Sequence, residues 1–337
     1  MRFGRRELFR FGAAGGAAAA FGAVAGAAVR RWGERPPAAA GQTPSAEVYC
    51  GSAAGSAYDA RFSPPRYLPV GARDALHCPP PPRPQPSGSG QDIALPIVET
   101  TLEVADGRNA RVWAYGGSVP GPILRATVGE RLRVTVSNES STPHSLHFHG
   151  SHELAQDGLL RIMPGQSARY EFTAGPVGFH PYHCHVPPYA CHIGRGMYGA
   201  LIVDPVGGRV PAHEFVLCLC GFDLEGAGHN DTYAWNGVAG YYERFPLKVP
   251  AGELVRLYIM NMVENDSVAS FHLHAQTFDV FRSGTSLTPH EHTDMVTLGP
   301  AERSILEFRL PRRGRYMFHP HQSHMAERGA MGFIAAV

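Results

Sequence analysis

The sequence predicts an all-β protein made of two tandem Greek-key β-sandwich domains. Short segments in the middle of the chain alternate apolar and polar residues, turn-forming residues separate these segments, and a long stretch of sequence occurs twice. Glycine (39 residues) and proline (29 residues) are abundant, which is typical of a turn-rich β protein. No long segment with helical periodicity competes with this interpretation.

The charge balance gives no sign of a nucleic-acid partner. The formal net charge is +1, only 18% of the residues are charged, and the sequence has neither a basic stripe nor a phosphate-binding glycine loop. A chain of 337 residues is long enough for two domains with sizeable cores. The outlier is histidine, with 18 residues, at least half of them in patterned clusters.

The first forty residues resemble an export signal. Arg5 and Arg6 form a twin-arginine motif, an apolar run of alanine, glycine and phenylalanine covers residues 11–29, and residues 38–40 offer a small-residue cleavage site. An uncleaved membrane anchor is the alternative, although alanine and glycine are only weakly hydrophobic. We expect a twin-arginine signal peptide over residues 1–40 and a periplasmic or secreted protein, with membrane contact only if the signal is retained.

Residues 41–92 form an irregular segment rich in proline and glycine, which we interpret as a linker or a surface wrap. Cys50 and Cys78 flank it, and their pairing as a disulfide stays open. From Ile93 onward the pattern becomes that of an antiparallel sandwich. Residues 100–104, 112–115, 131–137 and 169–172 alternate apolar and polar side chains between turns.

The second half of the chain repeats the first. Residues 144–149 (His-Ser-Leu-His-Phe-His) are echoed by residues 269–274 (Ala-Ser-Phe-His-Leu-His), and residues 179–185 are echoed by residues 315–321. Residues 195–202 likewise match residues 328–334. We place the boundary between Pro205 and Pro211, and so predict one domain over residues 93–207 and a second over residues 208–337.

Four His-x-His motifs, two in each repeat, are the most informative feature of the chain. They are His147-Phe148-His149, His183-Cys184-His185, His272-Leu273-His274 and His319-Pro320-His321. In a β-strand residues i and i+2 point to one face, so each motif can aim two imidazoles at one spot while Cys184 points to the other face. Eight imidazoles suffice for three metal ions. Because each domain supplies four, we expect this cluster where a first domain meets a second.

A second set of metal ligands occurs once. It consists of His144, Cys184, His192 and Met197. Two imidazoles, a thiolate and a weak thioether are the ligands of a blue-copper electron-transfer centre. In the second repeat the matching positions are Ala269, Pro320, Met325 and Ala330. All four ligands are missing there at once while the paired histidines are kept, so the chain carries two separate ligand sets.

These motifs resemble those of the multicopper oxidases. Residues 144–149 are similar to the H-x-x-H-x-H box of that family and residues 183–185 to its H-C-H box, and the resemblance covers residues 93–337. The segment 183–199 is similar to the copper loop of two-domain, laccase-like members, which carry the blue copper in the first domain. The resemblance implies two cupredoxin-like domains. It also implies one-electron transfer from a reductant through Cys184 to His183 and His185, and reduction of dioxygen to water.

The resemblance also divides the ligands among about four coppers per chain. In addition to the type 1 copper, it assigns His147 and His272 to a lone type 2 copper. It assigns the type 3 pair to His149, His183, His185, His274, His319 and His321. Asp157 matches an acidic residue near the cluster that orders hydrogen bonds or delivers protons, although an Asp-Gly turn is an equal interpretation. Asp294 is a weaker candidate of the same kind.

The partners implied are O2, a small reductant and further copies of the chain, since the two-domain relatives close the shared cluster as a homotrimer. A copper nitrite reductase is the nearest alternative, but that family holds one type 2 copper with three histidines and has an aspartate where His147 stands. A copper-binding protein without catalytic turnover is a further alternative. The reductant stays open among phenols, aromatic amines, Cu(I), Fe(II) and Mn(II). Unassigned are Cys191, His152, His180, His290 and His292.

Overall fold

Two pairs of β-sheets make up the described part of the chain, which in this computed structural model comprises residues 64, 76, 80–84 and 90–337. The all-β fold class predicted from the sequence is confirmed. The signal peptide, the anchor alternative and the pairing of Cys50 with Cys78 lie outside the described residues. Among the residues described, no helix is both long and apolar enough to cross a bilayer.

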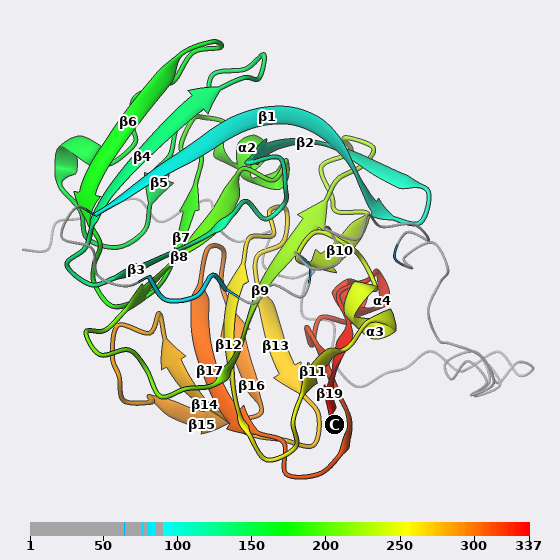
Figure 1. Cartoon of the computed structure of the whole chain (residues 1–337). Helices are drawn as coiled ribbons and strands as arrows, with labels where there is room; N and C mark the ends of the chain where they lie inside the picture. Colours follow the sequence, from blue (N-terminus) through cyan, green and yellow to red (C-terminus); the bar gives the residue numbers. More distant parts are fainter. Residues whose placement is uncertain (1–63, 65–75, 77–79, 85–89) are drawn as a thin grey trace, which may run out of the picture. The chain divides into compact units, whose positions relative to one another are not determined.

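The first pair of sheets uses strands from residues 91–204 (Figure 1). One sheet has the order β2-β1-β4-β6 and the other has the order β3-β8-β7-β5. The strands are β1 (Gln91–Ala105), β2 (Arg108–Tyr115), β3 (Ile123–Thr127), β4 (Arg131–Asn138), β5 (His147–Phe148), β6 (Ser167–Thr173), β7 (Gly178–His183) and β8 (Tyr198–Asp204). The segments expected to alternate all lie in these strands.

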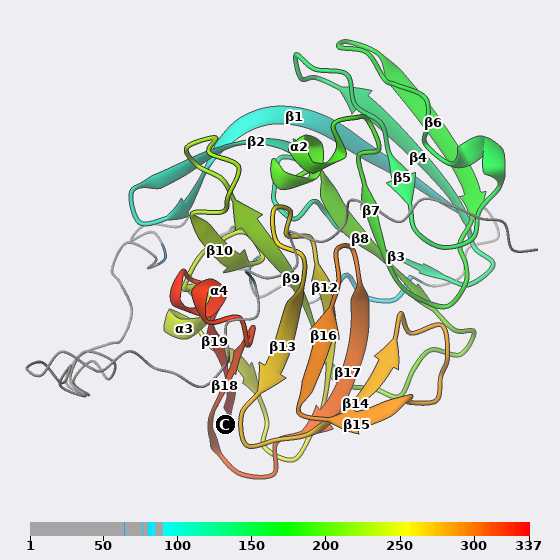
Figure 2. The same ribbon diagram turned by 180° about the vertical axis from the view of Figure 1, so that it is seen from behind.

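The second pair of sheets repeats this arrangement (Figure 2). Its sheets have the orders β10-β9-β12-β17-β14-β15 and β11-β19-β18-β13-β16. The strands are β9 (His213–Phe222), β10 (Thr232–Trp235), β11 (Leu247–Val249), β12 (Leu254–Asn261), β13 (Ala269–Leu273), β14 (Phe278–Arg282), β15 (Glu291–Thr293), β16 (Met295–Leu298), β17 (Arg303–Arg309), β18 (Gly314–His319) and β19 (Gly332–Ala336). The limits 93–207 and 208–337 stay a prediction.

The sheets are mixed, whereas the sequence pattern indicated antiparallel sandwiches. β1 pairs with β4 and β3 pairs with β8 in parallel, and in the second half β9 pairs with β12 and β11 with β19 in the same way. These partners are far apart in the chain, so no hairpin forces them to run antiparallel. The recurrence of both parallel pairs shows that the duplication seen in the sequence extends to the topology.

Within residues 90–337 the helices are short, as the sequence pattern predicted. They are η3 (Leu154–Gln156), α2 (Tyr189–Gly194), α3 (Tyr241–Arg244) and α4 (Ser323–Glu327). α2 follows β7 and α4 follows β18, so each of these two helices directly follows a His-x-His motif. The backbone N–H of Met197 donates to the carbonyl of His192, and that of Ala330 donates to the carbonyl of Met325. The two loops therefore align as the sequence repeat predicted.

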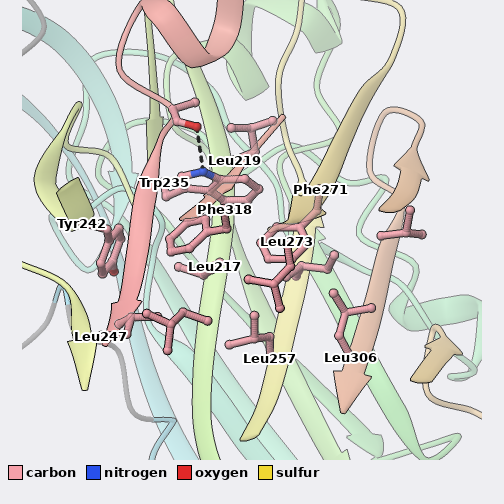
Figure 3. Close-up of a cluster of buried hydrophobic side chains, with 14 of the residues drawn as sticks. Leu217, Leu219, Trp235, Tyr242, Leu247, Leu257, Phe271, Leu273, Leu306 and Phe318 are labelled. Atoms are coloured by element: carbon pink, nitrogen blue, oxygen red, sulfur yellow. Dashed lines mark hydrogen bonds between the residues drawn. The ribbon is translucent and has the colours of Figure 1, made fainter. Parts of the chain in front are cut away.

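Three buried clusters hold the fold together. The core of the second sandwich is built from aromatic and leucine side chains, with Trp235 donating from Nε1 to the carbonyl of Ala330 at 3.1 Å (Figure 3). Phe271 and Phe318 are stacked in it, 5.7 Å apart. Another cluster joins residues of both sandwiches, including Tyr198 from β8 and Cys220 from β9. Since burial of apolar area is the main stabilising term, this shared core ties the halves into one compact unit.

A network of ion pairs also joins the two halves. Arg125 of β3 contacts Asp204 at 2.7 Å and Glu214 of β9 at 2.7 Å. Glu214 also accepts from Arg256 at 2.9 Å, and Arg256 contacts Glu307 at 2.6 Å. Hydrogen bonds from both arginines lower the pKa of Glu214, although burial by itself would raise it. The carboxylate is therefore ionised at neutral pH and links strands of both sandwiches.

Candidate copper centres

Three side chains predicted as blue-copper ligands converge in the first sandwich. The Nδ1 atoms of His144 and His192 lie 3.0 Å apart, and Cys184 Sγ lies 3.3 Å from His192 Nδ1 and 3.8 Å from His144 Nδ1. All three residues are buried, and their ligand atoms lie within 4.8 Å of one another. Met197 is fully buried in the same core cluster as Cys184, and its carbonyl accepts from the Cys184 N–H at 3.0 Å.

Local structure explains how these residues meet. His144 forms an isolated bridge with Ile162, Cys184 comes directly after β7, and His192 belongs to α2. The chain then turns at Gly196, which has φ +101°. A Cβ at this glycine would lie 2.4 Å from a methyl group of Val119, so only glycine permits the close approach that brings Met197 back to the site.

The electrostatics of this site favour a bound cation. Burial, and then the neighbouring His192, lowers the pKa of His144 to about 4, so its imidazole is neutral near pH 7. Burial raises the pKa of the Cys184 thiol, and a soft metal ion is what makes a buried thiol ionise. A neutral imidazole pair facing a buried thiol is therefore a donor set that suits copper.

Paired histidines of the first sandwich form a second group. His149 Nε2 lies 3.0 Å from His183 Nε2, and His147 belongs to the same candidate metal group. The ring centroid of His147 lies 5.4 Å from that of His185, and the centroids of His183 and His185 are 6.0 Å apart. Burial, and then His183, lowers the pKa of His149 to about 3. All four predicted histidines of this half therefore lie together.

The second sandwich repeats the group residue for residue. His274 Nε2 lies 3.0 Å from His319 Nε2, and His272 joins them in a candidate metal group. The ring centroid of His321 lies 5.5 Å from that of His272. His274 and His321 are exposed, whereas His183 in the first half is buried.

Backbone hydrogen bonds fix the orientation of four of these imidazoles. His147 and His272 donate from Nδ1 to the carbonyls of Asp157 and Asp294, each at 2.9 Å. His183 donates from Nδ1 to the carbonyl of Cys184 at 2.9 Å, and His319 does the same to the carbonyl of Pro320 at 2.8 Å. A proton held on Nδ1 leaves the Nε2 lone pair free, which is how proteins prepare histidine to bind a metal.

The histidine motifs lie at strand ends, not inside strands as the i, i+2 argument assumed. β5 is only His147–Phe148, β7 ends at His183, β13 ends at Leu273 and β18 ends at His319. The second histidine of each motif is therefore placed by the turn after the strand and not by the pleat. The register of the strands supports the arrangement instead, because His147 pairs with His183 and His272 pairs with His319.

Two serines that the sequence reasoning missed bind the backbone of the last histidine in the second H-x-H motif of each sandwich. Ser145 Oγ accepts from the backbone N–H of His185 at 2.9 Å, and Ser270 Oγ accepts from that of His321 at 2.7 Å. Both serines are buried. Their signal in the sequence is their presence at the same position of the two H-x-x-H-x-H-like boxes.

Asp157 lies beside His147 and also precedes a glycine turn. Its carboxylate Oδ1 lies 3.2 Å from His147 Nδ1, and it precedes Gly158, which has φ +77°. His152, left unassigned by the sequence, lies 3.8 Å from the same oxygen and completes a group with His147 and Asp157. These residues line an open pocket of about 490 Å³ together with Arg303 of the second sandwich.

Other histidines and cysteines lie outside these groups. His290 and His292, left unassigned by the sequence, are exposed, and His292 contacts Asp279 at 2.8 Å. His180 is buried and donates to the carbonyl of Pro176, and Cys191 is exposed on α2. Within the described residues, every candidate metal group draws its members from one sandwich only. Histidines of the first and second halves therefore form separate groups in a single chain.

Sequence models of the multicopper oxidase family match residues 97–207 and residues 222–336. A protein described as a copper-containing nitrite reductase of Neisseria meningitidis is 30% identical over 265 residues, which are 71% of this chain and 68% of that protein. A crystal structure of a multicopper oxidase has 41% identity and a TM-score of 0.72, with 73% of this chain and 89% of that chain covered. A copper nitrite reductase from Nitrosomonas europaea has 28% identity and a TM-score of 0.67, with 73% and 94% covered.

Proposed function

Because this chain belongs to the multicopper oxidase family, we propose that it is a laccase-like oxidase. It would couple one-electron oxidation of a phenolic, amine or metal-ion donor to reduction of O2 to water. The class is that of a copper-dependent oxidoreductase. The observation that carries the finer proposal is the complete second set of paired histidines, which repeats the first set down to its backbone hydrogen bonds.

We assign the ligands as the sequence predicted. His144, Cys184, His192 and Met197 would hold a type 1 copper. His147 and His272 would hold a type 2 copper. His149, His183, His185, His274, His319 and His321 would hold a type 3 pair. Bound copper supplies one-electron chemistry and an O2-binding centre.

The chain's own residues prepare this chemistry. Cys184 lies between His183 and His185 in sequence, so two covalent paths through the backbone join the thiol to imidazoles of the other group. The Nδ1 hydrogen bonds hold the Nε2 lone pairs outward. Asp157, at 3.2 Å from His147 and lining the open pocket, would pass protons from solvent toward the cluster.

A copper nitrite reductase is the second candidate, since proteins with that name are similar to this chain. Such an enzyme needs one type 2 copper and an aspartate where His147 stands. It has no use for both members of each histidine pair. Here buried serines at matching positions bind the backbone N–H groups of His185 and His321. A single three-histidine site would not require both of these histidines to be held in place.

We further propose that the active form is a homotrimer. Groups of ligand atoms in the described residues stay within one sandwich, and the second-half histidines His274 and His321 are exposed. A first domain of one chain that faces the second domain of the next would bring the halves together, and such a head-to-tail interface closes as a ring. We also propose a periplasmic or secreted location, on the sequence of residues 1–40.

The test combines metal content with the choice of acceptor. A copper-loaded preparation should contain about four coppers per chain, show an intense blue thiolate–copper band, and consume O2 with phenols, aromatic amines, Cu(I), Fe(II) or Mn(II). About two coppers per chain, with rapid conversion of nitrite to nitric oxide and no O2 turnover, would establish the nitrite reductase instead. Copper binding without turnover of either acceptor would leave a binding protein.

A further inference from the structure

A tryptophan covers the predicted type 1 ligands. The ring of Trp113, on β2, lies 5.0 Å from that of His144 and 4.9 Å from that of His192. His144 is 0% exposed, His192 3% and Cys184 0%, whereas Trp113 is 8% exposed. A reductant in solution therefore reaches neither imidazole freely, and Trp113 is the more exposed ring in contact with both.

An arginine is fixed over this tryptophan. The guanidinium carbon of Arg195 lies 4.6 Å from the centroid of the Trp113 ring, which is cation–π distance. The backbone N–H of Trp113 donates to the carbonyl of Arg195 at 3.0 Å, so the two residues are held together by main chain and by side chain. Arg195 is exposed, and it belongs to the loop that connects His192 to Met197.

The positive charge of Arg195 is not neutralised by an ion pair in the described part of the chain. Among the described residues no carboxylate lies within ion-pair distance of Arg195 or of Arg161. Glu99 is also near, but its carboxylate already accepts from Arg111 at 3.2 Å and from Ser141 at 2.9 Å.

The second sandwich provides an internal comparison. There Tyr233 donates from its backbone N–H to the carbonyl of Arg328 at 3.0 Å, as Trp113 does to Arg195. Arg328 donates to the carbonyl of Asn230 at 3.1 Å, and the ring of Tyr233 packs against His324. The backbone device is thus common to both repeats, but the tryptophan–arginine stack occurs on the half that carries the cysteine and its two histidines.

We propose that Trp113 and Arg195 form the docking and electron-entry surface of the type 1 site for anionic reductants. Arg195 attracts the negative group of the donor, and the Trp113 ring carries the electron by tunnelling to the imidazoles beneath it. The donor loses one electron to the cupric ion of the site, which becomes cuprous, and any proton that the oxidised donor releases leaves to solvent. The inference rests on the proposed function, since it needs copper at His144, Cys184 and His192.

Two inorganic one-electron donors of opposite charge test the charge preference. Ferrocyanide and hexaammineruthenium(II) carry no transferable proton, and anaerobic stopped-flow bleaching of the blue band measures the reduction step alone. Arg195→Ala should slow reduction by ferrocyanide by about five-fold or more at low ionic strength, with the effect fading in high salt. The same variant should leave hexaammineruthenium(II) unchanged or faster. Arg328→Ala, the matched change in the second repeat, should alter neither rate.

Trp113→Phe tests the route. The shorter ring lengthens the path from the surface, so this variant should slow both donors while the blue band stays in place. Tryptophan fluorescence of the copper-free chain gives a reading independent of turnover. The component lost in Trp113→Phe should be quenched more by iodide than by caesium, and Arg195→Ala should remove that preference.

These results separate the two proposals. If the copper-loaded chain shows no blue band, the proposed type 1 site fails, and the quenching comparison still decides whether Trp113 faces an anion-attracting surface. A blue band whose reduction rates are the same in wild type, Arg195→Ala and Trp113→Phe would overturn the inference and place electron entry elsewhere. Equal quenching by iodide and caesium would overturn the charge preference.

Discussion

Replacing Glu214 with glutamine tests how the two sandwiches are held together. The carboxylate lies 2.7 Å from Arg125 and 2.9 Å from Arg256, and it accepts from the Tyr258 hydroxyl at 2.8 Å. The side chains of Arg125 and Arg256 are 8% and 3% exposed, so Glu214→Gln removes from a mostly buried network a carboxylate that both arginines share. Removing one partner of a buried pair costs about 3–5 kcal/mol.

The expected loss is smaller because each arginine keeps a second carboxylate. Arg125 still contacts Asp204, and Arg256 still contacts Glu307. We therefore expect Glu214→Gln to lower the free energy of unfolding by about 2–3 kcal/mol, which for a domain unit of this size lowers Tm by about 4–10 °C. Urea denaturation at a fixed copper content measures it.

Glu253→Gln is the matched control. Glu253 pairs with His213 at the surface, where the two side chains are 59% and 37% exposed, and such pairs contribute about 0–1 kcal/mol. Equal losses for Glu253→Gln and Glu214→Gln, or a loss at Glu214 below about 0.5 kcal/mol, would refute the ion-network argument.

Acid should reduce the Glu214 effect. The folded-state pKa of Glu214 is lowered, so the stability that the carboxylate contributes is fully present above its unfolded pKa, close to the usual 4.5 of a glutamate. This stability is lost as the pH falls through the lower folded pKa. The difference between wild type and Glu214→Gln should therefore be constant near neutral pH and shrink well below pH 4.5. If the stability difference between wild type and Glu214→Gln grew on acidification, the pKa of Glu214 would be raised in the folded protein and not lowered.

Further predictions concern the metal sites and the assembly. Cys184→Ser should abolish the blue band while most cluster copper stays bound, as judged by metal analysis, because the thiol faces His192 and not the paired histidines. His272→Ala or His321→Ala should end O2 reduction and keep the blue band, and loss of the band in a folded variant would contradict the repeat alignment. Light scattering of the active enzyme should give the mass of a trimer, whereas full activity of a monomer at high dilution would reject the shared cluster.

Local pattern in the sequence was sufficient for the fold class and for the choice of side chains that gather into candidate metal groups. Alternation of side chains between turn residues predicted strands of the first sandwich, because the two-residue period of a strand is visible in its sequence, and the repeat extended the prediction to the second. The repeat separated ligands used once, such as Cys184, from those used twice, such as His183 and His319. It could do so because duplicated domains keep the same position for the same task.

The tertiary structure decided what lies around those ligands. Trp113 comes from β2 and contacts His144 and His192 only because the two sheets of the first sandwich pack against each other. The spacing of these residues in the sequence does not predict that contact. Ser145 and Ser270 act on backbone N–H groups far along the chain, brought near by strand register. The i, i+2 argument picked out histidines that lie together in the structure, yet turns after the strands orient them. Local periodicity fixes which face a residue takes within its own element, while long-range pairing alone fixes which other element it meets.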